Sequence, residues 1–398
     1  MIHQHYHPEM SGTARRTKEL AESFVKHGHI VSIVTSMPRE YRSMPGVMEQ
    51  KCFEKLNGVD VHRVKTLFEV KNNVIFRLLS YLSFVVLSLR YAYRLTGQSD
   101  IIVSIAPISS GIIGAFLRKV VGKHHHFDVP DILPDLGISA GMLKNKYIIS
   151  ALYKLERWVY DNSNTISTCT RGQTRNINGK GVALSKLRWI PDWIDNSFFV
   201  QHHARRMNDA KELISFPGKK LISFFGNIGA LQNPKVFLDV MKSLEDDGRD
   251  EYLLLFIGDG IKLPELKRIA RERNQENVLF LGRIERELVP SCMKRSDILV
   301  TNYVSDEHLD LYIPGKLFEY AISEKPIVMG ARGDAKEFIE KFKLGMVVEP
   351  SHVIDMKNAI LTVSNDAYEF TPQTAQFLKE YSLEKVTNLY SEVFKSLA

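Results

Sequence analysis

The chain has 398 residues, a length that predicts two domains of ordinary size, each large enough to hold its own hydrophobic core. An apolar content of 44% and a charged content of 25% are typical of a globular protein that is soluble in water. Its three cysteines are odd in number and far apart, which excludes a disulfide framework or a metal knuckle and indicates a reducing compartment.

Positive charge is concentrated in the first half of the chain. Residues 1–200 carry a net charge of +10, whereas residues 201–398 carry −3. The basic half predicts an anionic partner. Nucleic acid is disfavoured, because the sequence has no zinc finger, basic zipper or aromatic RNA-binding motif. An anionic membrane surface is the better candidate.

The chain begins with what we expect to be the carboxyl end of a strand, Ile2 to Tyr6. A loop from His7 to Thr13, a helix from about Ala14 to His27 and a buried strand from Ile30 to Thr35 are predicted to follow. Only a stub of the first strand is present, so this strand is unusually short or starts a few residues upstream. The N-terminus is rich in His and Pro and lacks the apolar run of a signal peptide.

Val74 to Leu95 is a long apolar segment for which three roles stay open. Its length approaches that of a membrane span, but arginines at both ends and serines inside it weigh against a span. A core helix or an interfacial helix is favoured instead, because the segment is basic and aromatic enough to rest on anionic lipid.

The rest of the first half alternates strands and helices. This alternation predicts a parallel sheet with helices on both faces. The stretch from Pro191 to about Lys219 is predicted to be a linker. The expected strands are Val59–Val64, Ile101–Ile105, His124–Val129, Thr165–Thr168 and Arg188–Pro191, and the expected helices are Gly111–Val121 and Tyr147–Tyr160.

The second half repeats this architecture. The predicted fold class is therefore α/β, with two doubly wound domains and a ligand crevice at the carboxyl ends of their strands, between them. Two strands end in glycine turns, Gly226–Gly229 and Gly258–Gly260, which let the backbone approach a phosphate but are also common without a ligand. The expected strands are Leu221–Phe225, Tyr252–Ile257, Val278–Leu281, Ile298–Thr301, Ile327–Met329 and Met346–Val348, and helices are expected at Pro234–Leu244, before Arg273 and from Thr374 on.

A short predicted helix from Lys316 to Ser323 carries the clearest binding chemistry. Its first-turn amides are expected to be unpaired donors suited to a phosphate, and Lys316 adds a cation beside them. Glu319 follows on the same face, where a carboxylate could bind the hydroxyls of a ribose. An ordinary surface loop and helix is the alternative for this stretch alone. Together with the two glycine turns, it favours a nucleotide-diphosphate site in the second domain.

Other nucleotide and metal motifs are missing from the sequence. It has neither G-x-x-x-x-G-K-[ST] nor a G-x-G-x-x-G that opens a helix, so neither an ATPase nor a dinucleotide enzyme is indicated. An Asp-x-Asp pair is also missing, so a divalent metal on the diphosphate is not expected. Neighbouring residues of a strand point to opposite faces, so the clusters His124–His126 and His3, His5, His7 are predicted to be sheet or crevice histidines rather than metal ligands.

Two aspartates, Asp131 and Asp135, flank Ile132-Leu133-Pro134 just past the end of an expected strand. Catalytic groups collect at such strand ends. A turn-forming role is the alternative for both aspartates.

With these pieces placed, the chain resembles glycosyltransferase family 4, which has the GT-B fold, over nearly its whole length. Within the family it is similar to the bacterial branch that adds fucose or N-acetylfucosamine to surface polysaccharides. The motifs that carry the resemblance are the first loop His7–Thr13, the passage Gly28–Val31, the hinge Pro191–Asp195, the donor-site helix Pro314–Tyr320 with Lys325–Val328, and, for the branch, Asp131–Asp135 with Gly141–Asn145.

The resemblance implies a retaining, metal-independent transfer of a sugar from a nucleotide diphosphate of the UDP or GDP type, with no cofactor. In the family's E-x7-E motif Glu319 matches the second glutamate, expected on the ribose, whereas the first falls at Leu311, next to Asp310. The implied donor-site residues are Gly226, Asn227, Gln232, Gly258, Arg283, Asp310, Lys316, Leu317 and Glu319. Many members have Arg and Lys where Asn227 and Gln232 stand, so Lys316 is the expected cation for the diphosphate.

The resemblance also implies roles for residues of the first domain. Asp131 matches a position near the anomeric carbon, where it would orient the acceptor hydroxyl or stabilise positive charge that develops on the sugar, while the leaving phosphate takes the proton. Asp131 and Glu319 are thus the implied catalytic residues, and Gly12, Arg15 and His126 the implied acceptor-side residues. A polyprenyl-diphosphate-linked saccharide is the expected acceptor, which places the protein in the cytoplasm, peripheral on the inner face of the bacterial cytoplasmic membrane.

The predicted domains are an acceptor-binding domain over 1–195, a nucleotide-sugar-binding domain over 196–373, and a C-terminal helix over 374–398 that packs back on the first domain. Surface polysaccharide synthesis, as O-antigen, capsule or exopolysaccharide, is the implied process. Two alternatives are a GT-B sugar-nucleotide epimerase and a degenerate GT-B protein that binds without catalysis.

Overall fold

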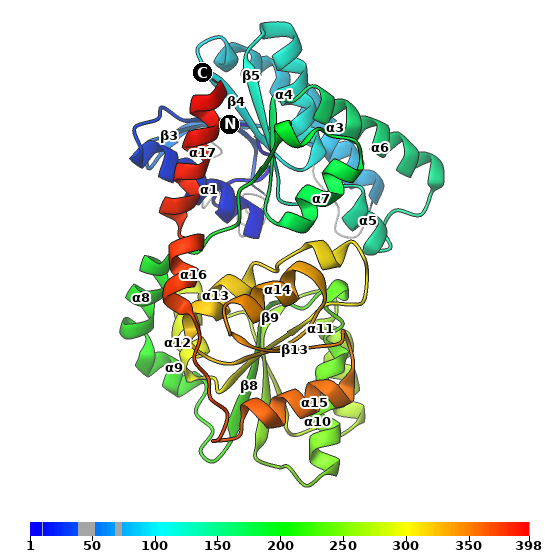
Figure 1. Ribbon diagram of the computed structural model, residues 1–398, viewed down its shortest axis with the longest axis vertical. Coiled ribbons are helices and arrows are strands. Elements are labelled where there is room, and N and C mark those ends of the chain that lie inside the picture. Colours follow the sequence, from blue (N-terminus) through cyan, green and yellow to red (C-terminus); the bar gives the residue numbers. More distant parts are fainter. Residues whose placement is uncertain (10, 39–51, 68–73, 398) are drawn as a thin grey trace. The chain divides into compact units, whose positions relative to one another are not determined.

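The computed structural model describes residues 1–398 except Met10, 39–51, 68–73 and Ala398; Met10, part of the predicted first loop, therefore lies outside the described residues. The chain forms two compact units, Met1–Asp192 with Leu383–Ala398, and Trp193–Ser382. Each unit is built around a β-sheet with helices on both sides (Figure 1). These limits differ from the predicted domain limits of 195 and 373, because the helix α16 (Thr374–Tyr381) belongs to the second unit.

The sheet of the first unit is built on both sides of the N-terminal stub. Ile2 forms parallel bridges with Val34 and with Ser104, and so lies between β1 and β4. The strand orders on its two sides are β2-β3-β1 and β4-β5-β6-β7, and among these described strands only the pair β2–β3 is antiparallel. The direction in which successive strands are added to the sheet therefore reverses at the N-terminal stub. The strands are β1 (Ser32–Ser36), β2 (Phe53–Leu56), β3 (Val59–Val64), β4 (Ile101–Ile105), β5 (His124–Val129), β6 (Thr165–Thr168) and β7 (Leu187–Trp189).

Helices cover both faces of this sheet, with α1 and α17 on one side and α3, α4 and α6 on the other (Figure 1). The ring of Phe24 in α1 packs against Tyr390 and Phe394 of α17, with ring centroids 5.7 and 5.3 Å apart. Within the described parts of the chain, no helix combines the length and the apolar character that crossing a bilayer requires. The helices are α1 (Gly12–Lys26), α3 (Val74–Thr96), α4 (Ile108–Val121), α5 (Asp135–Ser139), α6 (Lys146–Asp161), α7 (Arg171–Gly179) and α17 (Leu383–Leu397).

The predicted linker after Pro191 is wrong, because two helices, α8 (Asn196–Arg205) and α9 (Met207–Leu213), occupy most of it. Asp195 caps α8 by accepting hydrogen bonds from the amides of Ser197 and Phe198, at 3.0 and 3.3 Å. Phe199 and Ala210 are buried in the core of the second unit. The apolar residues of this stretch are too few and too widely spaced for the helical pattern to stand out in the sequence.

The second unit contains six parallel strands in the order β10-β9-β8-β11-β12-β13. The order reverses between β8 and β11, as in a doubly wound sheet. The predicted strands of this half are confirmed to within a few residues. Its elements are β8 (Lys220–Asn227), β9 (Tyr252–Asp259), β10 (Val278–Gly282), β11 (Ile298–Asn302), β12 (Ile327–Gly330), β13 (Gly345–Val348), α10 (Lys235–Asp246), α11 (Leu263–Glu272), α12 (Val289–Arg295), α13 (Lys316–Ser323), α14 (Gly333–Lys341) and α15 (Val353–Val363).

The core of the second unit lies in two layers, one on each face of the sheet. Along β8, Leu221 and Phe225 belong to one layer, and Ile222 and Phe224 to the other. This alternation follows from the period of two in a strand, and both faces are apolar because helices cover both. The first of these layers also contains α13, which carries much of the predicted site.

Candidate functional site

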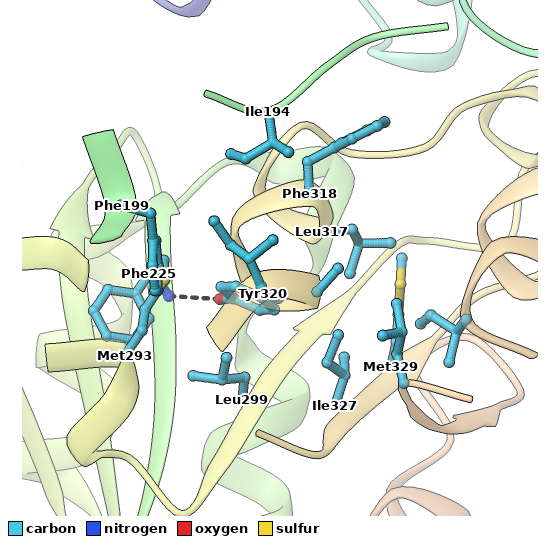
Figure 2. Packing of buried hydrophobic residues seen from close by; sticks show 14 of the residues in the cluster. Ile194, Phe199, Phe225, Met293, Leu299, Leu317, Phe318, Tyr320, Ile327 and Met329 are labelled. Atoms are coloured by element: carbon cyan, nitrogen blue, oxygen red, sulfur yellow. Dashed lines mark hydrogen bonds between the residues drawn. The ribbon is translucent and has the colours of Figure 1, made fainter. Parts of the chain in front are cut away.

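The sheet of the second unit opens between β8 and β11 at its carboxyl edge. The two strands pair only at Ile222–Ile298 and Ser223–Leu299. Beyond that point the hydroxyl of Tyr320, in α13, accepts a hydrogen bond from the Phe225 amide at 2.9 Å (Figure 2). The same hydroxyl donates to the carbonyl of Val300 at 3.4 Å. Tyr320 therefore bridges the two strands where the strand order reverses, which is where open α/β sheets bind ligands.

The helix α13 is held at this opening by its apolar residues. Leu317, Phe318 and Tyr320 are buried and point into the layer drawn in Figure 2. The first turn differs from the prediction, because the amide of Leu317 donates to the carbonyl of Pro314 at 2.8 Å and that of Phe318 to Gly315 at 3.3 Å. Two amides expected to be free for a phosphate are thus already used. The positive charge of Lys316 becomes correspondingly more important.

The two predicted glycine turns lie side by side at this edge. Gly226 at the end of β8 pairs in register with Gly258 at the end of β9. Their φ angles of +100° and +150° suit glycine. A Cβ atom on Gly258 would lie 1.9 Å from the carbonyl oxygen of Gly226, and one on Gly260 would lie 2.3 Å from that of Ile228. The two strand exits can therefore pack this closely only with glycine.

Lys316 lies beside Gly226. A Cβ atom on Gly226 would be 3.9 Å from the Lys316 Nζ, which also lies 3.8 Å from the centre of the Phe224 ring and 3.5 Å from the Gln232 Oε1. Burial lowers the pKa of Lys316 to about 7, although the charge of Glu319 acts in the opposite direction. An anion beside Gly226 would stabilise the charged form of this lysine.

The loop that carries Gln232 is fixed by Asn302, a residue that the sequence analysis missed. The Nδ2 of Asn302 donates to the Gln232 carbonyl at 3.0 Å and to the Ser351 hydroxyl at 3.1 Å, and its Oδ1 accepts from the Ser351 amide at 2.8 Å. Asn302 is fully buried. An amide side chain at the end of an otherwise apolar strand was the signal that could have revealed it.

Glu319 is paired with Arg286, which the sequence analysis also missed. The two guanidinium nitrogens donate to the two carboxylate oxygens at 2.6 and 3.0 Å, and the guanidinium lies 5.0 Å from the centre of the Phe198 ring. A bidentate pair fixes the plane of the carboxylate. A carboxylate oxygen can accept more than one hydrogen bond, so the pairing with Arg286 does not by itself exclude hydrogen bonds from hydroxyl groups.

The remaining predicted donor residues are Asn227, Arg283 and Asp310. Asn227 is opposite Asp259 in the β8–β9 register, and Arg283 forms an exposed ion pair with Asp259 at 3.3 Å. Asp310 lies instead against α14, since a Cβ atom on Gly333 would be 2.0 Å from its carbonyl oxygen. Burial raises the pKa of Asp310; Arg332 opposes this rise, and Asp306 and Glu349 add to it.

The predicted residues of the first unit have different surroundings. Asp131 follows β5 and is half-buried; burial and then repulsion from Asp192 raise its pKa to about 6, and Arg16 opposes the rise. Gly12 begins α1 with open space around it, and the exposed Arg15 lies 3.8 Å from Glu19.

His126 lies in the core rather than in a crevice, which corrects its assignment to the acceptor side. Its ring nitrogens are hydrogen-bonded to the hydroxyls of Thr165 and Ser167, at 2.8 and 2.9 Å, and no part of it is exposed. Burial lowers the pKa of His126 to about 4, so it is neutral. Within the described ranges, no group of three or more His, Cys, Asp or Glu side chains is arranged to hold a metal ion.

Two protein-family models match the chain. The model described as "Glycosyl transferases group 1" matches residues 206–383, and the one described as "Glycosyl transferase 4-like domain" matches residues 11–193. The chain is 25% identical over 304 residues to WcaI of Escherichia coli K12, a glycosyl transferase named for colanic acid biosynthesis, covering 73% of each chain. It is 22% identical over 249 residues to the glycosyltransferase WbjE of Pseudomonas aeruginosa, covering 61% of this chain and 60% of that one.

Solved structures resemble the whole chain. Anabaena Alr3699/HepE in complex with UDP and glucose superimposes with a TM-score of 0.73 at 13% identity, over 99% of this chain and 98% of that chain. The sucrose-phosphate synthase of Thermosynechococcus elongatus gives a TM-score of 0.77 at 16% identity, over 100% and 98%. WaaG, a glycosyltransferase involved in lipopolysaccharide biosynthesis, gives 0.68 at 11% identity, over 100% and 98%.

Proposed function

Because the chain belongs to the group 1 glycosyltransferases and has the GT-B fold, we propose that it moves a sugar from a nucleotide diphosphate to a lipid-linked saccharide during surface polysaccharide synthesis. Its similarity to WcaI, which is named for colanic acid biosynthesis, supports the proposed process. A donor sugar of the fucose or N-acetylfucosamine type remains part of this proposal.

The observation that carries the proposal is the position of the Lys316 ammonium beside Gly226, where the sheet opens. Because Gly226 and Gly258 have no side chains, the backbone at the ends of β8 and β9 is not covered by side chains of these two residues. The diphosphate of the donor would lie against Gly226 with Lys316 as its counter-charge. Asn227 and Gln232 would add amide hydrogen bonds, and a transfer that needs no metal ion is part of the proposal.

Glu319 would bind the ribose of the donor. The Arg286 pair holds the carboxylate in one plane, and ribose hydroxyls would donate hydrogen bonds to its oxygens. A family relative, Anabaena HepE, has been solved with UDP and glucose, which supports a nucleotide of this kind. Whether uridine or guanosine is preferred is part of the test below.

Asp131 would act on the acceptor. In a retaining front-face transfer, the bond between the sugar and the diphosphate breaks while the acceptor oxygen bonds to the same face of the sugar. The proton of the acceptor hydroxyl leaves with the diphosphate. Asp131, whose charged form predominates above pH 6, would accept the hydrogen bond of that hydroxyl and orient it.

A mixed apolar and basic surface on α3 and α4 suits a membrane-bound acceptor. Leu82 and Val86 of α3 are 60% and 61% exposed, and lie one turn apart on the same stripe. The adjacent helix α4 exposes Phe116 and Val120. Basic side chains frame these apolar ones: Arg90, Arg94, Arg118, Lys119 and Lys123. We therefore propose that the protein binds the inner face of the cytoplasmic membrane peripherally through this α3–α4 surface.

Sedimentation with lipid vesicles tests the α3–α4 surface. The double variant Arg90→Gln/Arg94→Gln should weaken binding to anionic vesicles by up to about 30-fold, since each of the two cations contributes about 1 kcal/mol near such a surface. Leu82→Ser/Val86→Ser should weaken binding to both anionic and neutral vesicles. Lys267→Gln/Arg268→Gln, the same charge change on the second unit, is the control. Unchanged sedimentation of both α3 variants would overturn the proposed membrane site.

The proposed transfer is tested with radiolabelled UDP- and GDP-sugars and a bacterial membrane extract as acceptor source. We expect label from one nucleotide sugar to appear in a lipid-extractable saccharide, which would also identify the base and the sugar. Label that remains in a new nucleotide sugar would indicate an epimerase instead. Binding of a nucleotide sugar without any product, across the whole panel, would contradict the transferase assignment.

A further inference from the structure

A buried charge cluster in the first unit lies outside the residues assigned above. The guanidinium of Arg16, in α1, forms ion pairs with Asp128 of β5 at 2.5 Å and with Asp192 at 2.6 Å. Asp128 has no exposed surface and also accepts a hydrogen bond from the Ser167 hydroxyl at 2.6 Å. A buried guanidinium with two charge-assisted partners is fixed in position.

Other elements of the unit meet the same guanidinium. Its second terminal nitrogen donates to the Tyr390 hydroxyl of α17 at 3.4 Å and to the Cys169 sulfur at 3.6 Å. The Cys169 thiol in turn donates to Asp192 at 3.5 Å. The residues Arg16, Asp128, Cys169, Asp192 and Tyr390 thus form one cluster, the Arg16 cluster, drawn from α1, β5, the end of β6, the segment after β7 and α17.

Asp131 lies three residues beyond Asp128 and shares this environment. Burial raises its pKa first, repulsion from Asp192 raises it further, and attraction to Arg16 opposes both. Burial also works against the charged form of Asp128, but the charge and hydrogen bonds of Arg16 hold the pKa of Asp128 below its usual range. Three carboxyl groups therefore share the attraction of one guanidinium. In the described residues Arg16 forms close ion pairs with Asp128 and Asp192, and acts on Asp131 through its charge.

The remaining titratable groups of the cluster are neutral near pH 7. Burial raises the pKa of the Cys169 thiol well above its usual range, with Asp192 adding to the effect. Burial likewise raises the pKa of the Tyr390 hydroxyl, with Asp128 adding to the effect. The neighbouring His126 is neutral because burial lowers its pKa to about 4. The charges that act on Asp131 are thus those of Asp192 and Arg16.

We propose that Arg16 and Asp192 are positioning residues for the transfer reaction. Asp192 places a second negative charge near Asp131 and holds Arg16 on Asp128, which makes Asp131 a stronger hydrogen-bond acceptor for the incoming hydroxyl. The inference rests on the role of Asp131 proposed above. A carboxylate accepts a hydrogen bond more strongly when a like charge is near and its counter-charge is engaged elsewhere. The proton still leaves with the diphosphate, so the stoichiometry of the reaction is unchanged.

The test titrates Asp131 directly by carbon-13 NMR of carboxyl-labelled aspartate, with its resonance assigned by its loss in Asp131→Asn. Asp192→Asn should lower the pKa of Asp131 by about one unit, because a neighbouring negative charge is removed. The double variant Arg16→Gln/Asp128→Asn should raise it, because Arg16 is the cation that lowers the pKa of Asp131, and the Asn leaves no unpaired charge at the fully buried position 128. Asp161→Asn, a surface carboxylate of the same unit, should leave it unchanged.

The pH dependence of kcat/KM supplies the second readout. The wild-type rate should fall as the pH drops through about 6, where Asp131 takes up its proton. This acid limb should move to lower pH in Asp192→Asn and to higher pH in the double variant. A pKa of Asp131 that does not move in Asp192→Asn overturns the charge coupling. If the pKa moves as expected and the acid limb does not follow, the coupling exists but Asp131 is not the group that the reaction uses.

Discussion

Replacing Lys316 with methionine is expected to weaken binding of the nucleotide diphosphate by about 2–3 kcal/mol, roughly 30- to 150-fold in Kd. Methionine keeps most of the side-chain length that lies over the Phe224 ring and removes only the charge beside Gly226. Folding stability should not fall, because burial already works against the charged form of this lysine. Isothermal titration with UDP and GDP measures the binding, and thermal unfolding measures the stability.

The control for this prediction is Lys294→Met, which removes a lysine that pairs with Glu324 on the surface of the same unit. Its effect on nucleotide binding should be negligible, since an exposed ion pair contributes at most about 1 kcal/mol, and that to stability alone. Equal affinities of Lys316→Met and the wild type would place the diphosphate elsewhere.

Gly258→Ala is expected to destabilise the second unit by about 3 kcal/mol or more. Its φ of +150° is unsuited to an L-residue, and the new Cβ atom would meet the Gly226 carbonyl oxygen at 1.9 Å. The ends of β8 and β9 would have to separate, which would also displace Gly226 from Lys316 and weaken nucleotide binding. Urea unfolding gives the first effect, and titration of the surviving folded protein gives the second.

Gly248→Ala separates backbone strain from this steric effect. Gly248 also has a positive φ, +70°, but a Cβ atom there would meet nothing within 4 Å. Its cost should therefore be only about 1 kcal/mol, with nucleotide binding intact. If the two alanine variants cost the same, the close packing of the strand exits is not what requires glycine at Gly258.

Features that a short stretch of sequence determines could be predicted. Gly226 and Gly258 each follow an apolar run that has the length of a strand, and the structure has them in register at one edge. Lys316 and Glu319 lie on a helix that its flanking Pro and Gly residues delimit, and α13 has the predicted bounds. The parallel α/β architecture of both halves follows from the alternation of strands and helices and is confirmed.

Features that join distant parts of the chain could not be predicted. Arg286 and Glu319 are 33 residues apart, and Arg16 and Asp128 are 112 apart, so no local pattern announces either pair. Each is a charged residue that looks like surface in the sequence and acquires its partner only when the chain folds. The same reason hid the role of Asn302, which fixes the Gln232 loop through Ser351.

Histidines of the first sheet show a further limit of sequence patterns. His125 and His126 are sheet histidines, as predicted, and lie on opposite faces of β5, against Gly114 of α4 and Tyr390 of α17, but both are fully buried. His125 is hydrogen-bonded to Ser104 at 2.6 Å and His126 to Thr165 at 2.8 Å, on neighbouring strands. A sheet covered by helices on both faces can bury polar side chains on either face, provided that hydroxyl groups supply their hydrogen bonds.

The incomplete E-x7-E motif acquires a local context in the structure. Leu311 occupies the place of the first glutamate, and the neighbouring Asp310 lies against Gly333 at the start of α14. Burial raises the pKa of Asp310, Arg332 opposes this rise, and the charges of Asp306 and Glu349 add to it. A substitution of Asp310 for the missing glutamate therefore stays a prediction.

Proton uptake on nucleotide binding tests the central claim, that Lys316 holds the donor diphosphate, most directly. The pKa of Lys316 is about 7 in the free protein, so near pH 8 most of this lysine is neutral. A bound diphosphate would raise that pKa, so binding should take up a large fraction of a proton near pH 8, and affinity should fall as the pH rises above 7. Titration with UDP or GDP in two buffers of different ionisation enthalpy should therefore give different apparent heats. Equal heats in the two buffers would contradict the account.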